Sequence, residues 1–255
     1  MKVNCKHLII LVVALLFGGS TTLLAQELTA LEIITKADEK GRGSSSEQVL
    51  TLTIVRPDWS RSLGLKSWSK GVDYSLIYIT SPAKEKGQVF LKRQKDMWNW
   101  VPSIERMIKI PPSMMTQSWM GSDFTNDDLV KVSSVVVDYT HTLLGKELVR
   151  GVNCYKLELI PLPDAAVTWG KLLVWVTVDD LNNWKTEYYD EDMELVNSMN
   201  CFDVKLLGDR VIPTRMEIEP ANKKGHKTVI EIVSSTFNKP IADSFFSQQN
   251  MKSIK

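Results

Sequence analysis

Residues 111–129 read PPSMMTQSWMGSDFTNDDL, and this apolar segment interrupts a chain that otherwise has the alternating pattern of β-strands. Two consecutive prolines suit the first turn of a helix and Gly121 suits its end, so we expect a helix of about two turns here. Thr125 and Asp128 have the spacing of a capping box, which predicts a second short helix from about Asn126. Together the two helices would form a flap over a sheet.

The flap and the strands before it are rich in large, adaptable apolar side chains. In a helix, Met115 and Trp119 would share one face at the i, i+4 spacing. Methionine adapts to irregular partners and tryptophan contributes a large apolar area. Such a set suits either the wall of an apolar cavity or ordinary core packing beneath a loop. The candidate lining or lid residues are Trp98, Trp100, Met114, Met115, Trp119, Met120 and Phe124.

Segments with a period of two residues account for most of the remaining chain. Residues 50–54 alternate leucine or isoleucine with threonine, and Trp98 and Trp100 would point to one side of a strand with Asn99 opposite. Strands recur about every ten residues, with a turn expected at Gly145, which predicts one antiparallel sheet of about ten or eleven strands. A sheet this long must curl. The predicted fold class is therefore mainly β (α+β), with a single antiparallel curved sheet forming an incomplete β-barrel.

Two elements are available to cover the concave face of this sheet. Thr29 and Glu32 form a capping box, and the helical periodicity that follows predicts an amphipathic helix over residues 28–40. The flap is the second element. If both fill the concave space completely, the protein is a folded half-barrel; if they leave a gap, it is a receptacle for something hydrophobic.

The first residues have the pattern of a secretory signal peptide. Lys2 and Lys6 precede an apolar run over residues 8–17, and Ala25 provides a small residue at a cleavage point. The run is shorter than the roughly 20 residues that a membrane-spanning helix needs. We therefore expect a cleaved signal peptide at residues 1–25, one domain at residues 26–255, and export of the protein.

Charge and cysteine content limit the partners. The full chain carries 31 Lys and Arg against 30 Asp and Glu, and loss of Lys2 and Lys6 with the leader keeps this balance near zero. Nucleic acid or an anionic membrane as the main partner would require an excess of basic residues. Cys154 and Cys201 would remain after cleavage. They would share a sheet face, and the sequence is compatible with either a disulfide or two inert thiols.

The chain lacks the motifs expected of an enzyme or a metal protein. His141 and His226 have no neighbours at metal-ligand spacing, and no Gly-x-Ser-x-Gly elbow occurs. The acidic stretch at residues 190–194 fits a solvated turn better than a calcium site. We therefore expect no catalytic residues, no metal and no cofactor.

Several motifs resemble the LolA-like outer-membrane lipoprotein-sorting proteins. The matching pieces are Trp-x-Trp-x-Pro at residues 98–102, Met-Gly-Ser-Asp-Phe-Thr at residues 120–125 and Arg-Gly-Val-Asn-Cys-Tyr-Lys-Leu at residues 150–157. With the leader, the amphipathic helix and the long meander, the resemblance spans nearly the whole chain after residue 25. The Met-Gly-Ser-Asp-Phe string is typical of one branch of that family.

This resemblance implies a hydrophobic cavity in an incomplete β-barrel, and a periplasmic carrier of lipid or lipoprotein acyl chains towards the outer membrane. It implies transient membrane contact, an inner-membrane RND-type exporter and an outer-membrane acceptor as partners, and no nucleic acid. The alternative is a non-catalytic accessory or scaffold protein of an RND-type envelope export complex, which would dock through the apolar flap without any ligand. The resemblance supplies no catalytic residue.

Overall fold

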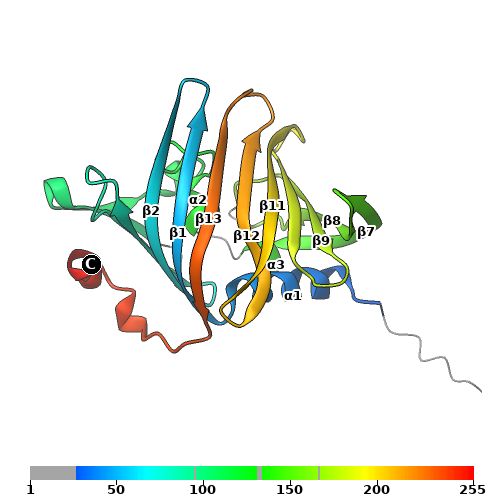
Figure 1. Ribbon diagram of the computed structural model, residues 1–255, viewed down its shortest axis with the longest axis horizontal. Coiled ribbons are helices and arrows are strands. Elements are labelled where there is room, and N and C mark those ends of the chain that lie inside the picture. Colours follow the sequence, from blue (N-terminus) through cyan, green and yellow to red (C-terminus); the bar gives the residue numbers. More distant parts are fainter. Residues whose placement is uncertain (1–26, 95, 131–133, 166) are drawn as a thin grey trace, which may run out of the picture.

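The computed structural model describes residues 27–94, 96–130, 134–165 and 167–255. The signal peptide expected at residues 1–25 lies outside these ranges. None of the described helices has both the length and the hydrophobicity that a membrane crossing requires. The described residues are organised around one large, curved β-sheet (Figure 1).

Thirteen strands form this sheet in the order β6-β5-β4-β3-β2-β1-β13-β12-β11-β10-β9-β8-β7, and adjacent strands are antiparallel. The strands are β1 (Ser45–Arg56), β2 (Trp59–Lys70), β3 (Tyr74–Ser81), β4 (Val89–Arg93), β5 (Asp96–Val101), β6 (Arg106–Ile110), β7 (Tyr139–Val149), β8 (Val152–Pro161), β9 (Lys171–Thr177), β10 (Asn183–Tyr189), β11 (Leu195–Leu207), β12 (Arg210–Pro220) and β13 (Lys227–Phe237). Two meanders, β1–β6 and β7–β13, are joined where β1 pairs with β13. The segment between β6 and β7 therefore runs from one edge of the sheet to the other.

The predicted fold class, one curved antiparallel sheet that stays open, is confirmed, but the predicted strand count is too low. The sequence pattern did not define the residues of β2, because its few apolar residues, Leu63, Leu65 and Trp68, are spread among serines and basic residues. The turn predicted at Gly145 is wrong, because Gly145 lies inside β7 at a shift in register after Leu143. A glycine within a strand often marks such an irregularity rather than its end.

Short helices and turns complete the chain. They are α1 (Ala30–Arg42), α2 (Asn126–Val130), α3 (Ser134–Val137) and α4 (Gln248–Ser253), with the 3-10 turns η1 (Pro102–Ile104), η2 (Pro112–Met114) and η3 (Asp243–Phe245). The capping box that begins α1 is confirmed, since Thr29 Oγ1 accepts from the Glu32 N–H at 3.3 Å and the Thr29 N–H donates to Glu32 Oε2 at 2.8 Å. The helix ends two residues beyond the predicted range.

The inner face of the sheet is covered by α1 over one half and by residues 111–128, which we call the flap, over the other. In Figure 1 the flap helix α2 lies behind β1 and β13. Ile33 and Ile34 of α1 pack in a cluster with inward-facing residues of β8 and β9, including Leu157. Tyr188 of β10 contacts both this cluster and the cluster under the flap. The inner face therefore carries two adjoining apolar cores.

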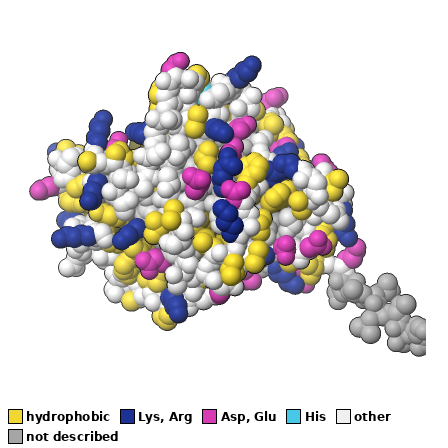
Figure 2. Space-filling view, viewed as in Figure 1, with side chains coloured by type: hydrophobic (Ala, Val, Ile, Leu, Met, Phe, Trp, Pro, Cys, Tyr) yellow, Lys and Arg dark blue, Asp and Glu magenta, His cyan; other side chains and the backbone are white. Residues whose placement is uncertain are grey.

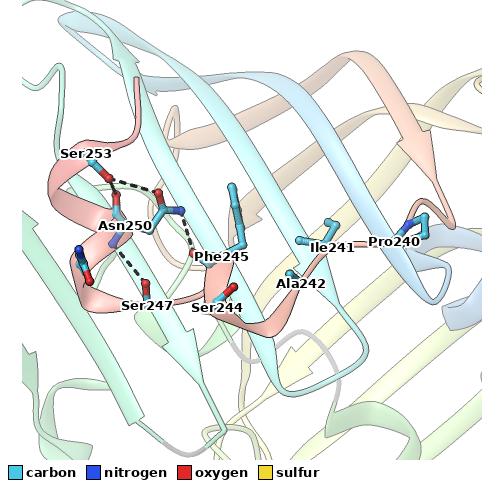
Figure 3. Close-up of a pocket in the computed structure, with 9 residues that line it drawn as sticks. Pro240, Ile241, Ala242, Ser244, Phe245, Ser247, Asn250 and Ser253 are labelled. Carbon is cyan, nitrogen blue, oxygen red and sulfur yellow. Dashed lines mark hydrogen bonds between the residues drawn. The ribbon is translucent and has the colours of Figure 1, made fainter.

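The C-terminal segment, residues 238–255, covers part of the outer face. The apolar cluster on this side contains Trp68, Leu76, Tyr78, Val89, Leu91, Phe246 and Met251, with Trp98 and Trp100 packed against it. An open groove of about 580 Å³ runs along this segment. Figure 3 shows the residues that line it, from Pro240 to Ser253. Asn250 Nδ2 donates to the Phe245 carbonyl at 2.7 Å, and the Asn250 N–H donates to Ser247 Oγ at 3.2 Å. The polar groups along the groove are thus engaged with one another.

Elsewhere on the outer face, basic side chains form ion pairs and contact aromatic rings. Figure 2, which looks onto β1, β13 and β12, shows basic and acidic side chains interleaved over the middle of this face. Arg215 and Lys227 both pair with Glu217. Further along the sheet, the Lys185 ammonium lies 4.4 Å from the ring centroid of Trp175. Charges of both signs interspersed in this way are typical of a protein surface.

The two cysteines of the described chain are free thiols. Cys154 lies in β8 and Cys201 in β11, so two strands separate them, and strand alternation places them on opposite faces. Three strand spacings amount to ~14 Å, twice the Cα separation that a disulfide permits. The expectation that they share a face is wrong, and of the two alternatives the structure gives the free thiols.

Burial should make both thiols inert in the native protein. It raises the pKa of Cys201 to about 12 and that of Cys154 to about 11. At pH 8 only about one Cys154 in a thousand would be a thiolate, the form that reacts. With Cys5 replaced by serine, we expect iodoacetamide at pH 8 to add no mass to the native protein and to label both thiols in guanidinium chloride. Rapid labelling of the native protein would contradict this burial.

Candidate functional site

The flap is a looped hairpin rather than the predicted two-turn helix. Pro112 begins η2, and the chain then turns back at Met120 and Gly121, whose φ angles are 50° and 80°. The Ser122 N–H donates to the Trp119 carbonyl at 2.9 Å, which closes a tight turn with two central residues of positive φ. The prediction of a helix ending at Gly121 is wrong because this glycine supplies the turn.

The second predicted flap helix is confirmed as α2. The Thr125 N–H donates to Asp128 Oδ2 at 2.8 Å, and the Asp128 N–H donates to Thr125 Oγ1 at 3.0 Å. Trp169, just before β9, donates its Nε1–H to Asp128 Oδ1 at 2.8 Å. Burial raises the pKa of Asp128, and the hydrogen bonds from Thr125 and Trp169 oppose that rise. The start of α2 is therefore anchored to the second meander.

The flap turns its largest side chains onto the inner face. Trp119 is fully buried and lies against Phe90 of β4, with ring centroids 5.1 Å apart, and Phe124 is also buried. The buried residues around them are Leu52, Ile54, Leu63, Leu65, Ile77, Ile79, Met97, Ile110, Ile218 and Ile230, with Met115 and Met120 packed against the cluster. Flap side chains thus occupy the centre of this inner-face core, and the flap is closed on the sheet.

Arg56 holds the turn of the flap. Arg56 is the next inward-facing residue of β1 after Ile54. Its Nη1 lies 2.9 Å from Asp123 Oδ2, and its Nη2 donates to the Gly121 carbonyl at 2.8 Å. Only 11% of the Arg56 side chain and 7% of the Asp123 side chain are exposed. Thr228 of β13 donates to Asp123 Oδ2 at 2.7 Å and accepts from the Asp123 N–H at 2.9 Å. Arg56 of the first meander and Thr228 of the second therefore both bind the turn of the flap.

Arg61 makes a second polar contact with the same turn. Its Nη2 donates to the Met120 carbonyl at 2.5 Å, and its Nη1 lies 3.3 Å from Glu85 Oε1. Arg61 belongs to β2 and faces Ile54 in the β1–β2 register, so both arginines project from one hairpin. Guanidinium groups replace the hydrogen bonds that these flap carbonyls would otherwise make to water. A few polar contacts, which water or a partner could take over, hold the backbone of the turn.

Two buried polar atoms next to Phe90 have no hydrogen-bond partner within the described ranges. They are Trp119 Nε1 and Asn99 Oδ1. Asn99 of β5 lies directly opposite Phe90 in the β4–β5 register, while Trp119 packs against the Phe90 ring. A donor and an acceptor therefore flank the same aromatic side chain.

The structure divides six of the seven predicted site residues between the two faces of the sheet and leaves Met114 on neither. Four of them gather in the inner-face cluster under the flap: Met115, Trp119, Met120 and Phe124. Met114 is 38% exposed in η2. Trp98 and Trp100 lie on the outer face, with the C-terminal segment, because they alternate with Met97, which points inward. The sequence correctly placed the two tryptophans on one face but could not show that the flap covers the other.

Arg56, Arg61 and Asn99 are site residues that sequence reasoning did not single out. The sequence could have indicated Arg56, because it comes two residues after Ile54, at a position of β1 where the alternation predicts an inward-facing hydrophobic residue. Arg61 has the same relation to Leu63 and Leu65 of β2. A charged residue on the inward phase of a strand needs a partner, and here the partner is the flap.

Other polar residues of interest make local contacts. His141 Nε2 lies 2.6 Å from the Val135 carbonyl, and Ser122 Oγ lies 3.3 Å from the Phe124 carbonyl. In the part of the chain that the structure describes, no three His, Cys, Asp or Glu side chains are arranged to hold a metal ion.

Comparison with known proteins shows what the chain is similar to. A family model described as "Uncharacterized protein" matches residues 71–253, well over half of the chain. A search of curated proteins gives no match.

Solved structures have the same fold. A LolA superfamily protein from Nitrosomonas europaea is 27% identical, with a TM-score of 0.76 over 88% of this chain and 100% of that one. A DUF1329 family protein from Desulfovibrio piger is 24% identical, with a TM-score of 0.79 over 87% and 97% of the two chains. An outer membrane lipoprotein-sorting protein domain from Vibrio parahaemolyticus is 21% identical, with a TM-score of 0.77 over 88% and 98%. The chain therefore belongs to the matched family, which is a family of LolA-like proteins.

Proposed function

We propose that the protein is a non-catalytic periplasmic carrier that binds acyl chains of a lipid or lipoprotein between the sheet and the flap, for transfer towards the outer membrane. The observation that carries this proposal is the flap itself. Its apolar side chains cover the inner face, while its turn is held by polar contacts from Arg56 and Arg61. Once those contacts open, an acyl chain can take the place of Phe124 and Met120 on the sheet while Trp119 stays against Phe90.

The energetics predict a dependence on chain length. Lifting Phe124 and Met120 from the core, with Trp119 retained against Phe90, would cost ~1.5–3 kcal/mol for each side chain, whereas each buried methylene of a ligand returns ~0.8 kcal/mol. Chains shorter than about eight carbons would not offset the opened flap, and longer chains would. Met115 and Met120 can repack around ligands of different shape, because methionine has three rotatable bonds and no branch.

A displacement assay tests this proposal. We expect dansylundecanoic acid to bind with a blue-shifted emission, palmitate to displace it and hexanoate to leave it in place. Mass spectrometry of an organic extract should detect co-purified lipid. A lipid-free extract together with no uptake of the dansyl probe would overturn the carrier function.

Matched methionine variants locate the binding site. Met115→Gln keeps the length of the side chain but places an amide against the inner-face cluster, so we expect palmitate affinity to fall about tenfold. Met193→Gln makes the same change at a side chain that is 50% exposed in the β10–β11 turn, and it should leave affinity unchanged. Equal affinities in the two variants would place the ligand elsewhere.

Exposed apolar residues at the β6 edge favour a second candidate, a scaffold role in an RND-type export complex. Ile104, Ile108 and Met114 are 57%, 43% and 38% exposed, and among the described strands β6 is the last at this edge of the sheet. In that role, Ile108→Asp should abolish co-purification of an RND-type exporter or an outer-membrane acceptor, and the wild-type extract should contain no lipid. Retention of these partners by the variant would count against docking at this edge.

A further inference from the structure

A donor and an acceptor lie unpaired inside the apolar core under the flap. Trp119 is fully buried and its Nε1–H meets no acceptor within the described ranges, and the buried Asn99 Oδ1 meets no donor there. Nearly all buried polar groups in proteins have a partner, and an unsatisfied one is costly. Among the described residues, the closed state therefore leaves Trp119 Nε1 and Asn99 Oδ1 without partners in the core, in addition to Arg61 Nε and Glu85 Oε2 near the turn of the flap.

A carrier of plain hydrocarbon would gain nothing from these groups. Apolar side chains at positions 119 and 99 would pack in the same core without the cost of burying an unpaired polar group. Both polar atoms flank Phe90, since Asn99 lies opposite it in the β4–β5 register and Trp119 packs on its ring. One small ligand group beside Phe90 could thus meet a donor and an acceptor together.

We propose that the bound acyl chain is joined through a secondary amide, whose carbonyl accepts from Trp119 Nε1 and whose N–H donates to Asn99 Oδ1. This inference rests on the proposed carrier function and names the ligand's linking group. A secondary amide supplies one acceptor and one donor, an ester supplies only the acceptor, and an alkane supplies neither. Because β5 lies one strand from the β6 edge, a head group beyond the amide can emerge there.

Three ligands of equal length separate these contributions. N-methylpalmitamide, methyl palmitate and octadecane, delivered from cyclodextrin, compete against the bound dansyl probe. For the wild-type protein we expect the amide to bind about tenfold more tightly than the ester, and the ester about tenfold more tightly than the alkane, since each step removes one hydrogen bond to a buried group.

Two variants assign each step to one residue. Trp119→Phe retains an aromatic ring and should abolish the preference for ester over alkane, while Asn99→Leu should abolish only the preference for amide over ester. Trp59→Phe, at an exposed tryptophan, should keep both preferences. Thermal melts followed by circular dichroism verify that each variant is folded, and the Asn99 variant tests the inference independently should Trp119→Phe fail to fold.

The outcomes distinguish this inference from the carrier function. Binding of all three ligands within twofold of one another, or preferences that persist in both variants, would overturn the amide assignment and leave the carrier function standing. Failure of every ligand to displace the probe, together with no uptake of the probe, would overturn both.

Discussion

Replacing Trp119 with alanine should lower the free energy of unfolding by ~3–5 kcal/mol, the cost of removing a large aromatic side chain from a packed core. Trp119 is fully buried, contacts Phe90 and belongs to the cluster that joins the flap to both meanders. Urea denaturation followed by far-UV circular dichroism measures the loss. The slope of the transition should stay near the wild-type value, because the native fold is retained.

Trp59 provides the matched control. It is 51% exposed at the start of β2, where the Arg56 guanidinium carbon lies 5.9 Å from its ring centroid. Trp59→Ala should cost less than ~1 kcal/mol, as most surface substitutions do. Similar losses in the two variants would mean that the flap tryptophan is not packed on the sheet.

Replacing Arg56 with alanine should cost ~3–5 kcal/mol, because the change leaves the Asp123 carboxylate buried without its cation. The Gly121 carbonyl would lose its donor in the same step. We also expect backbone amides of residues 119–124 to exchange faster with deuterated solvent, since the turn of the flap would open more often. Chemical denaturation and hydrogen exchange measured by mass spectrometry report the two effects separately.

Two comparisons make the Arg56 result specific. Lys109 pairs with Asp96 at 2.8 Å, but both side chains are about half exposed, so Lys109→Ala should change stability by less than ~1 kcal/mol. The double variant Arg56→Ala with Asp123→Ala should be more stable than Arg56→Ala alone, because no uncompensated charge remains. A double variant that is less stable than the single one would show that the carboxylate is satisfied without Arg56.

The sheet could be predicted from sequence to the extent that its side chains alternate. The row Leu50, Leu52 and Ile54 signals β1 directly, because one face of that strand is buried. The bounds of β2 were not predicted, since serine, glycine and lysine occupy most of its positions and its pairing with β1 and β3 determines its conformation. Propensity is a weak guide where tertiary contacts decide.

The site was predictable only in part, because the sequence gives the phase of each strand but not which element covers each face. Trp98 and Trp100 share a face as expected, yet the C-terminal segment covers them rather than the flap. The flap conformation was also beyond local reasoning. Pro112 and Gly121 fit a helix as well as a turn, and an isolated two-turn helix has little stability of its own. Burial of Trp119 and the contacts of Asp123 with Arg56 and Thr228 favour the turn.

The route of the chain between the two edges of the sheet has a consequence for proteolysis. Because residues 111–138 link β6 to β7 while β1 pairs with β13, a single cut in that link would yield two fragments of six and seven strands. The β1–β13 ladder would still join them into one particle after the nick. Separately expressed fragments should therefore reassemble, which would give a split protein whose two halves meet along strands of twelve and eleven residues.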